Sequence, residues 1–357
     1  MKNLNDIKEF DQNLIKQTIE NCENILINNY KLNNKNKTIL IYDNNSNLSK
    51  LLYLGYKNAL KKLNLKFEEF IFYEKSQEEI KEIIDKLNQD DLVILIQSSS
   101  FRMSKYRWRN LLFDQNLKVI EHPHLEKNIG ENQIQIYINS LNYNMDYYLK
   151  TSKILKEKLE KSNKLKIISS DNSVVEVLSK VDKTYDNIAY FEDKKNYGTR
   201  FPIGEVLTEA KCLEDLNGEF LLYAFPNTSH KTQIVKPFKC IVKKGKLVSH
   251  QGPKEFDEVY KMIQTENPEK EVFIRELGFG LNKGIKKFDK LGDISSYERL
   301  VGFHFSLGMK HGIYAKKLYP KYGRKFYQRY HIDVFIDLKE IYIEDEKIYE
   351  QEKGWLI

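Results

Sequence analysis

Apolar residues follow two different patterns in the first part of the chain, and each predicts its own kind of element. In residues 6–26 they recur every three or four positions, which is typical of an amphipathic helix. Residues 38–42 and 92–96 are short continuous apolar runs, which favour buried strands. Helical segments such as residues 48–63 alternate with such runs as far as residue 121, and this alternation predicts a mostly parallel sheet with crossover helices.

The pattern changes after a predicted connecting helix at residues 143–161. Strand pairs now follow one another, for example residues 234–242 and 247–251 on either side of a Lys-Lys-Gly-Lys turn. A chain of 357 residues also exceeds the usual size of a single hydrophobic core. We therefore predict an α/β fold with an N-terminal α/β domain at residues 1–165 and a C-terminal mixed α+β domain, which would bind metal, at residues 166–357.

Composition and charge narrow the class of protein. Lys and Arg number 58 against 51 Asp and Glu, a net charge of +7, but both signs are interleaved, so we expect no nucleic-acid partner. Three distant cysteines without a Cys-x-x-Cys pair argue against a zinc ribbon and favour a reducing compartment. The N-terminus lacks a signal-peptide pattern and no segment has the length of a membrane span, so we expect a cytoplasmic protein with no membrane partner.

The candidate chemistry begins at residues 330–337, where apolar and polar residues alternate. This alternation predicts a strand with His331 and Asp333 on one face. Upstream, Glu205, Glu276 and His304 each stand alone among apolar and glycine residues. An unpaired buried carboxylate is costly, so each acid needs a partner. Taken singly, an ion pair with Lys or Arg explains each acid better than a metal does.

Taken together, the same five residues offer two imidazoles and three carboxylates, a set that suits two divalent ions such as zinc, cobalt or manganese. One shared carboxylate can bridge ions that lie about 3.5–4 Å apart. Such a site lowers the pKa of bound water and polarises a carbonyl, so the natural reaction is hydrolysis of an amide or peptide bond. The nucleophile would be the metal-bound water, and no side chain is assigned as the proton shuttle.

Four motifs in this half of the chain resemble the metallo-aminopeptidases of the thermophilic aminopeptidase T, S and II type. They are Pro-x-Gly-Glu-Val-x-Thr, Glu-Leu-Gly-x-Gly-x-Asn, His-x-x-Leu-Gly and His-x-Asp, at residues 202–208, 276–282, 304–308 and 331–333. The order and approximate spacing agree, and the resemblance covers residues 195–340. It implies an aminopeptidase that acts on peptides or small amides as a homodimer.

The resemblance also implies how the metals are shared. Glu205 and Asp333 would hold one ion, His304 and His331 would hold the other, and Glu276 would bridge them. The chain departs from the family in having His311 where a Tyr usually follows the strand His, with Tyr314 three positions on, and Lys283 in place of a Pro. We predict that His311, Tyr314 and Tyr330 lie beside the metal ligands and hydrogen-bond to them or to the substrate.

Other functions stay open at this point. His304, His331 and Asp333 could instead hold one iron as the facial triad of a dihydroxypyridine ring-cleaving dioxygenase, which would leave Glu205 and Glu276 unoccupied. A binding protein without activity, or an enzyme that modifies one specialised amide metabolite, would keep the same fold.

Two further stretches carry weaker signals. His122-Pro123-His124 could bind metal, but the proline and the polar setting favour an exposed turn. Residues 316–329 combine basic and aromatic side chains, for which we predict a place near a substrate carboxylate or in a solvated loop.

Overall fold

The computed structural model describes residues 10–103, 106–191, 197–266, 269–315 and 330–357. The chain forms two compact units, of which the first comprises residues 1–145 and 189–203 and the second comprises residues 146–188 and 204–357. The chain therefore passes from one unit to the other three times.

The predicted boundary between residues 165 and 166 lies inside the second unit, because the connecting helix belongs to that unit. Side chains of helix α6 (Met145–Lys161) form hydrogen bonds with other residues of the second unit. Ser152 and Lys156 both donate to Asp186, over 2.7 and 2.9 Å. Later in the same helix, Glu160 accepts a hydrogen bond of 2.9 Å from the backbone N–H of Thr184.

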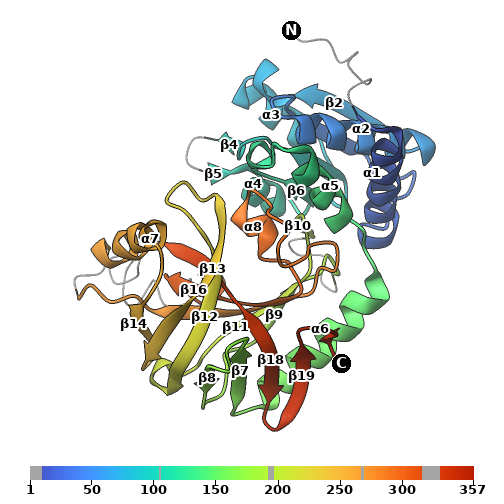
Figure 1. Ribbon diagram of the computed structural model, residues 1–357. Coiled ribbons are helices and arrows are strands. Elements are labelled where there is room, and N and C mark those ends of the chain that lie inside the picture. The colour runs from blue at the N-terminus through green and yellow to red at the C-terminus, as the bar shows by residue number, and fades with distance from the viewer. Residues whose placement is uncertain (1–9, 104–105, 192–196, 267–268, 316–329) are drawn as a thin grey trace. The chain divides into compact units, whose positions relative to one another are not determined.

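The first unit contains the predicted parallel sheet (Figure 1). Its order is β10-β6-β3-β1-β2, and all neighbours are parallel. The strands are β1 (Thr38–Tyr42), β2 (Phe67–Ile71), β3 (Leu92–Ile96), β6 (Lys118–His122) and β10 (Gly198–Arg200). The edge strand β10 is formed after α6, where the chain returns to the first unit. The sequence patterns do not indicate this return.

Helices pack against this sheet because its central strands β1 and β3 are buried along their whole length. They are α1 (Gln12–Asn24), continued by a π-helical turn (Ile25–Asn29), α2 (Asn47–Lys62), α3 (Gln77–Ile84), α4 (Trp108–Asp114) and α5 (Glu131–Ser140). On one face, Ile41 and Leu95 share a buried cluster with Ile80 of α3 and Leu112 of α4. A short hairpin of β4 (Arg102–Met103) and β5 (Tyr106–Arg107) stands apart from the sheet.

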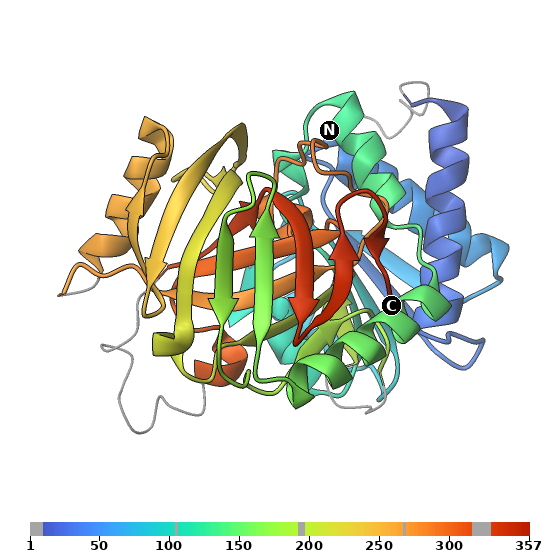
Figure 2. The same ribbon diagram turned by 60° about the horizontal axis from the view of Figure 1, so that its bottom comes forward.

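The second unit is built on a large antiparallel sheet (Figure 2). Its main path is β20-β19-β18-β7-β8-β12-β17-β16-β15-β11-β9, and β13 and β14 extend it from β12. The strands are β7 (Leu165–Ser169), β8 (Val174–Val177), β9 (Tyr185–Asn187), β11 (Glu205–Glu209), β12 (Leu216–Pro226), β13 (Thr232–Lys243), β14 (Lys246–His250), β15 (Ile274–Gly280), β16 (Gly302–Gly308), β17 (His331–Ile336), β18 (Leu338–Ile343), β19 (Glu346–Glu350) and β20 (Gly354–Trp355). The predicted mixed helix and strand class therefore agrees with the structure.

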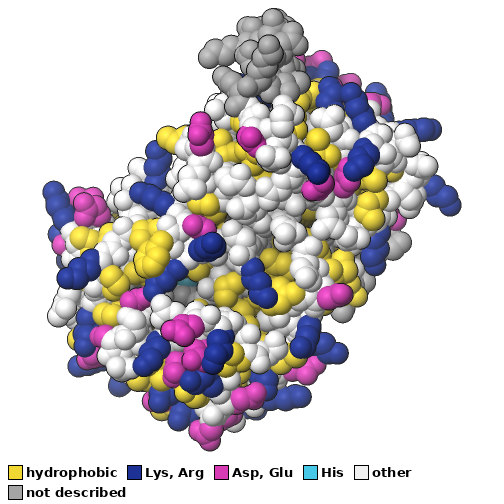
Figure 3. Space-filling model, turned by 45° about the vertical axis from the view of Figure 1, so that its right-hand side comes forward, with side chains coloured by type: hydrophobic (Ala, Val, Ile, Leu, Met, Phe, Trp, Pro, Cys, Tyr) yellow, Lys and Arg dark blue, Asp and Glu magenta, His cyan; other side chains and the backbone are white. Residues whose placement is uncertain are grey.

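Few helices accompany this sheet: besides α6 they are α7 (Lys254–Thr265), α8 (Ile294–Tyr297) and α9 (Gly312–Ala315) among the described residues. Aromatic side chains fill much of the interior, where Phe305 contacts Phe220 and Phe303 at ring distances of 5.2 and 4.9 Å. None of the helices in the described part of the chain has the length and apolar character needed to cross a membrane. Figure 3 shows basic and acidic side chains intermingled over one face of the molecule.

His122 corrects the interpretation of the His-Pro-His stretch, because it is fully buried at the end of β6 and not in an exposed turn. Its Nε2 lies 2.8 Å from the Tyr56 hydroxyl and its Nδ1 lies 2.9 Å from the Tyr137 hydroxyl. Both ring nitrogens are therefore satisfied by protein groups. Burial lowers the pKa of His122 from 6.5 to about 3.

Lowering the pH from about 7 to about 5 is expected to cost the folded chain about 2 kcal/mol through His122 alone. Above pH 6.5 the imidazole is neutral in both the folded and the unfolded chain. Below pH 6.5 the imidazole binds a proton in the unfolded chain, whereas in the folded chain it stays neutral down to about pH 3. Stability therefore falls as the pH falls through this window. Urea unfolding of the parent and of His122→Asn, followed by Trp108 emission in a Trp355→Phe background, measures the effect.

The exposed His230 provides the matched control, since His230→Asn should leave the pH dependence of the parent unchanged. An equal pH dependence in His122→Asn and in the parent would contradict the assignment.

Candidate metal centre

Four neighbouring strands of the second unit, β11, β15, β16 and β17, place the five predicted ligands on one face of the sheet. Gly278 of β15 lies opposite Leu207 on one side and His304 on the other. Ser306 of β16 lies opposite Asp333. Because alternate residues of a strand share a face, Glu205, Glu276, His304, His331 and Asp333 all point to the same side.

A glycine makes room for the first group of ligands. A Cβ atom at Gly278 would lie 2.1 Å from Nε2 of His304, so the imidazole occupies the space directly above this glycine. The ring can therefore reach across β15. His304 Nε2 lies 3.3 Å from Oε1 of Glu205 and 3.5 Å from Oε1 of Glu276.

The second group is centred on His331. Its Nε2 lies 3.2 Å from Oδ1 of Asp333 and 3.6 Å from Oε2 of Glu276. Its Nδ1 lies 3.2 Å from the carbonyl oxygen of Met309, to which an Nδ1–H donates, so Nε2 is directed at the carboxylates. Burial lowers the pKa of His331, but Asp333 and Glu276 outweigh it and raise the pKa to about 10. In the absence of an ion, a proton thus neutralises part of this acidic group.

Glu276 belongs to both groups. Oε1 faces His304, whereas Oε2 faces His331 and lies 3.9 Å from Nε2 of His311. Burial raises the pKa of the Glu276 carboxyl, but His304, His331 and His311 outweigh it and hold the pKa below its usual value. The pKa of Asp333 is also well below its usual value, because the attraction of His331 outweighs burial. Both carboxylates are therefore charged and ready to bind a cation.

Several ligand atoms are buried without a hydrogen-bond partner. They are Oε1 of Glu205, Oε2 of Glu276, Nε2 of His304 and Oδ1 of Asp333. Buried polar atoms normally have partners, because an unmade hydrogen bond is costly. Four such atoms within one cluster fit the donor set of divalent cations, since these atoms would coordinate an ion in place of a hydrogen bond.

Ligand atoms that lie within 4.8 Å of one another form three groups among the described residues. Glu205, Glu276 and His304 form one, and Glu276, His331 and Asp333 form another. This grouping differs from the pairing that the resemblance implied, in which Glu205 joined Asp333 and His304 joined His331. The physical reason is strand order: β11 and β16 flank β15, whereas His331 and Asp333 share β17.

The third group contains a residue that sequence reasoning missed, Glu298, together with His304 and Asp333. Glu298 also accepts from Arg299 over 2.7 Å, and the buried Arg299 guanidinium contacts Oε2 of Glu205. The expected ion pair of Glu205 with a basic residue is therefore present, but it engages one oxygen and leaves Oε1 facing His304. The signal for this pair is the Glu-Arg dipeptide just before the apolar strand β16.

The three residues predicted to surround the ligands differ in their positions. His311 lies beside Glu276, and its Nδ1 accepts from the backbone N–H of Ile313 over 3.3 Å, so Nε2 carries the proton. The Tyr314 hydroxyl donates to the carbonyl of Lys183 over 2.6 Å and is therefore engaged outside the ligand groups. The Tyr330 carbonyl accepts from Met309, the residue that orients His331. The basic and aromatic residues 316–329 lie outside the described part of the chain.

Two further residues support the site through the backbone. Ser306 Oγ accepts from the N–H of Glu276 over 2.9 Å and so fixes the strand at the shared carboxylate. Glu209 is fully buried, accepts from Lys310 over 2.6 Å and accepts from the N–H of His311 over 2.7 Å. Glu209 thus positions His311 next to Glu276.

Comparison with known proteins gives similarity of fold alone. No family model and no curated protein sequence matches this chain. The structure is similar to that of 2,5-dihydroxypyridine dioxygenase from Pseudomonas putida KT2440, with a TM-score of 0.59 and 12% identity over 96% of this chain and 98% of the other. It is also similar to wild-type AmpT from Thermus thermophilus, with a TM-score of 0.55 and 10% identity over 96% of this chain and 99% of the other. The chain therefore shares its fold with these two proteins, and its candidate ligand groups are a feature of its own structure.

Proposed function

We propose that the chain is a hydrolase with two metal ions that releases N-terminal residues from peptides or cleaves a related amide. The observation that carries this proposal is the position of Glu276, which directs one carboxylate oxygen to each of two ligand groups. A carboxylate shared in this way is what a pair of bridged cations requires. The AmpT-like fold supports the same activity by analogy alone.

The ligand groups favour this function over a one-iron dioxygenase. A facial triad would need His304 and His331 on the same ion, but no group of described residues within 4.8 Å combines these two side chains. Each group that the structure forms contains at least two carboxylates instead. Carboxylate-rich sets of this kind suit zinc, cobalt or manganese in hydrolytic sites.

Each neighbouring residue would have a defined part in the reaction. When bound, two cations supply an acidified water and polarise the carbonyl of the scissile amide. Arg299 holds one oxygen of Glu205, and Ser306 holds the backbone of Glu276. His311 presents its Nε2–H next to Glu276 with about a third of its side chain exposed (34%), so it is the proposed hydrogen-bond donor to the substrate.

Metal analysis together with assays on short peptides tests the proposal. We expect about two zinc, cobalt or manganese ions per chain and release of free amino acids. One ferrous iron per chain with oxygen consumption would overturn the hydrolase in favour of a dioxygenase. Metal content without turnover on a peptide library would favour the non-catalytic or specialised-metabolite alternatives. The homodimer and the cytoplasmic location stay predictions.

Replacing Gly278 by Ala is expected to remove one of the two ions and leave the other. The added methyl group would meet the His304 imidazole at 2.1 Å and displace it from Glu205, whereas His331 and Asp333 keep their places. We expect affinity at the His304 group to fall at least about 100-fold. Metal titration followed by elemental analysis measures the stoichiometry.

Gly312→Ala is the matched control, because nothing lies within 4 Å of a Cβ atom at that position. It should retain both ions. Tight binding of two ions by Gly278→Ala would refute the arrangement.

A further inference from the structure

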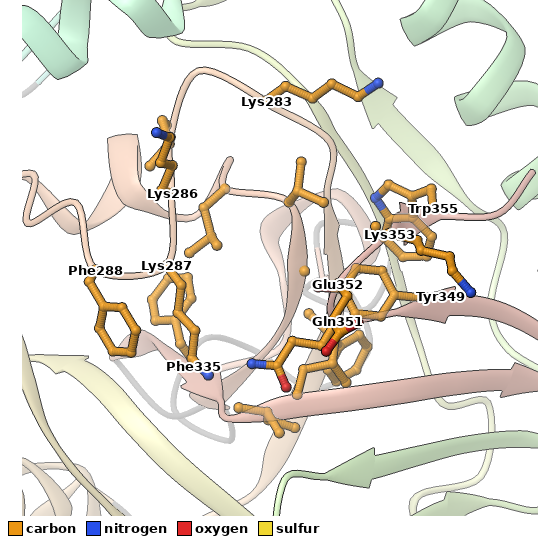
Figure 4. A pocket seen from close by; sticks show the side chains of 18 of the residues that line it. Lys283, Lys286, Lys287, Phe288, Phe335, Tyr349, Gln351, Glu352, Lys353 and Trp355 are labelled. Atoms are coloured by element: carbon orange, nitrogen blue, oxygen red, sulfur yellow. The ribbon is translucent and has the colours of Figure 1, made fainter.

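The second unit contains a cavity of about 510 Å³ that no part of the proposed reaction uses. Its wall is formed by residues from the loop after β15, the start of β16, the end of β17 and the last two strands (Figure 4). None of the five candidate metal ligands lines it. The volume lies in the range of small-molecule binding sites.

Aromatic side chains form much of the cavity wall. Phe335 and Tyr349 are buried, and Phe288 at the rim is 74% exposed. The Trp355 indole N–H donates to the carbonyl of Gly280 over 2.9 Å, so this ring is held in one orientation. The exposed Phe288 ring at the rim of this aromatic cavity is therefore a surface that a ligand would cover.

The charges around the cavity are unequal. Four lysines line it, Lys283, Lys286, Lys287 and Lys353, against the single carboxylate of Glu352. Two of the lysines are already neutralised, since Lys287 pairs with Asp337 and Lys353 lies 3.0 Å from Glu350.

The other two lysines are available to a ligand. Lys283 lies 3.8 Å over the Tyr147 ring, and no carboxylate of the described residues lies within ion-pair distance of Lys283 or Lys286. Both lysines belong to the loop on one rim, whereas Gln351 and Glu352 lie on the opposite rim (Figure 4). The loop after β15 thus adds two lysines without a carboxylate partner among the described residues to the rim of an aromatic cavity, although their ammonium groups point in different directions in Figure 4.

We propose that this cavity binds a small aromatic carboxylate. The ring of the ligand would pack against Trp355, Tyr349 and Phe335, and its carboxylate would bind at the rim that carries Lys283 and Lys286, whose flexible side chains would turn toward it. Glu352 on the opposite rim disfavours a ligand with charge at both ends, so a monoanion with its charge at one end fits best. None of the five candidate ligands lines the cavity, although the two sites are neighbours, because the Phe335 ring lies 5.3 Å from the His304 ring.

Three probes of similar chemistry test the proposal in a Trp108→Phe background, with Trp355 emission as the signal: phenylacetate, neutral phenylacetamide, and acetate. The titrations use the full-length Glu276→Gln chain in chelator, so that a carboxylate cannot bind to metal. We expect saturable binding of phenylacetate, at least about tenfold weaker binding of phenylacetamide, and no response to acetate. Equal affinities for the acid and the amide, or no saturable response to phenylacetate, would overturn the proposal.

A lysine variant locates the site. Lys283→Gln with Lys286→Gln should weaken phenylacetate binding at least about tenfold. Lys239→Gln with Lys246→Gln, on β13 and β14 of the same unit, removes two lysines that pair with Glu219 and Glu271 and should leave the affinity unchanged. Equal affinity in both double variants would exclude this cavity as the site. Because the metal-free chain is used, failure of the hydrolase proposal would not change these results.

Discussion

A Glu276→Gln chain is expected to lose tight binding of both metal ions and at least about 1000-fold of its activity on peptides. The reason is that each oxygen of Glu276 serves a different ligand group, so one substitution removes a ligand from both. The neutral amide has nearly the same shape as the carboxylate, and the strand should keep its hydrogen bond to Ser306. Elemental analysis and the rate of amino-acid release measure the two effects.

Glu209→Gln is the matched control for this substitution. Glu209 is equally buried, lies opposite Glu276 on the neighbouring strand and points to the same face, but it is neutralised by Lys310. We expect Glu209→Gln to retain two ions. Loss of metal in both variants would show that removing any buried charge on this face is enough to abolish metal binding. Loss of only one ion from Glu276→Gln would refute the bridging position of Glu276.

Arg299→Ala is expected to lower the free energy of unfolding of the metal-free chain by about 3–5 kcal/mol. The guanidinium and the Glu205 carboxylate are only 7% and 4% exposed, and the same guanidinium also contacts Glu298. The substitution takes away the guanidinium that contacts both Glu205 and Glu298. Urea unfolding in chelator, followed by Trp355 emission in a Trp108→Phe background, measures the loss.

Metal should stabilise Arg299→Ala more than the parent chain, because a cation next to Glu205 replaces part of the lost positive charge. Lys239→Ala provides the comparison: its pair with Glu219 is 36% and 45% exposed, so water screens it and we expect a much smaller change. Equal losses in the two variants would argue that the Arg299 pair contributes nothing specific.

Local patterns were sufficient to predict much of this fold. The continuous apolar runs at β1 and β3 predict buried strands, and in the structure parallel neighbours pair with both edges of each while helices pack against the sheet. The candidate ligands were found by a chemical contrast, since a lone acid such as Glu205 or Glu276 among apolar and glycine residues needs a partner. Their convergence on one face follows from strand pairing, which a single sequence does not contain.

The features that were missed depend on distant contacts. In α5, Ile134, Ile136 and Ile138 alternate as in a strand, and all three are buried in a helix. Strand β10, which joins the first sheet, has only three residues, Gly198–Arg200. This is too short to show the alternation of apolar and polar residues that predicts a strand. The pairing of ligands required the order β11-β15-β16-β17, and Glu298 resembles an ordinary surface acid until Arg299 is seen to be buried.

The ligands are spread over strands that leave the ribosome at different times. When β16 has been made, the chain already holds Glu205, Glu276 and His304, but the residues that complete the second group arrive only with β17. A product that stops before residue 331 could thus hold at most the first ion. Premature termination in this region also removes β17, which pairs with both β12 and β16, so the sheet loses an interior strand together with the second ligand group.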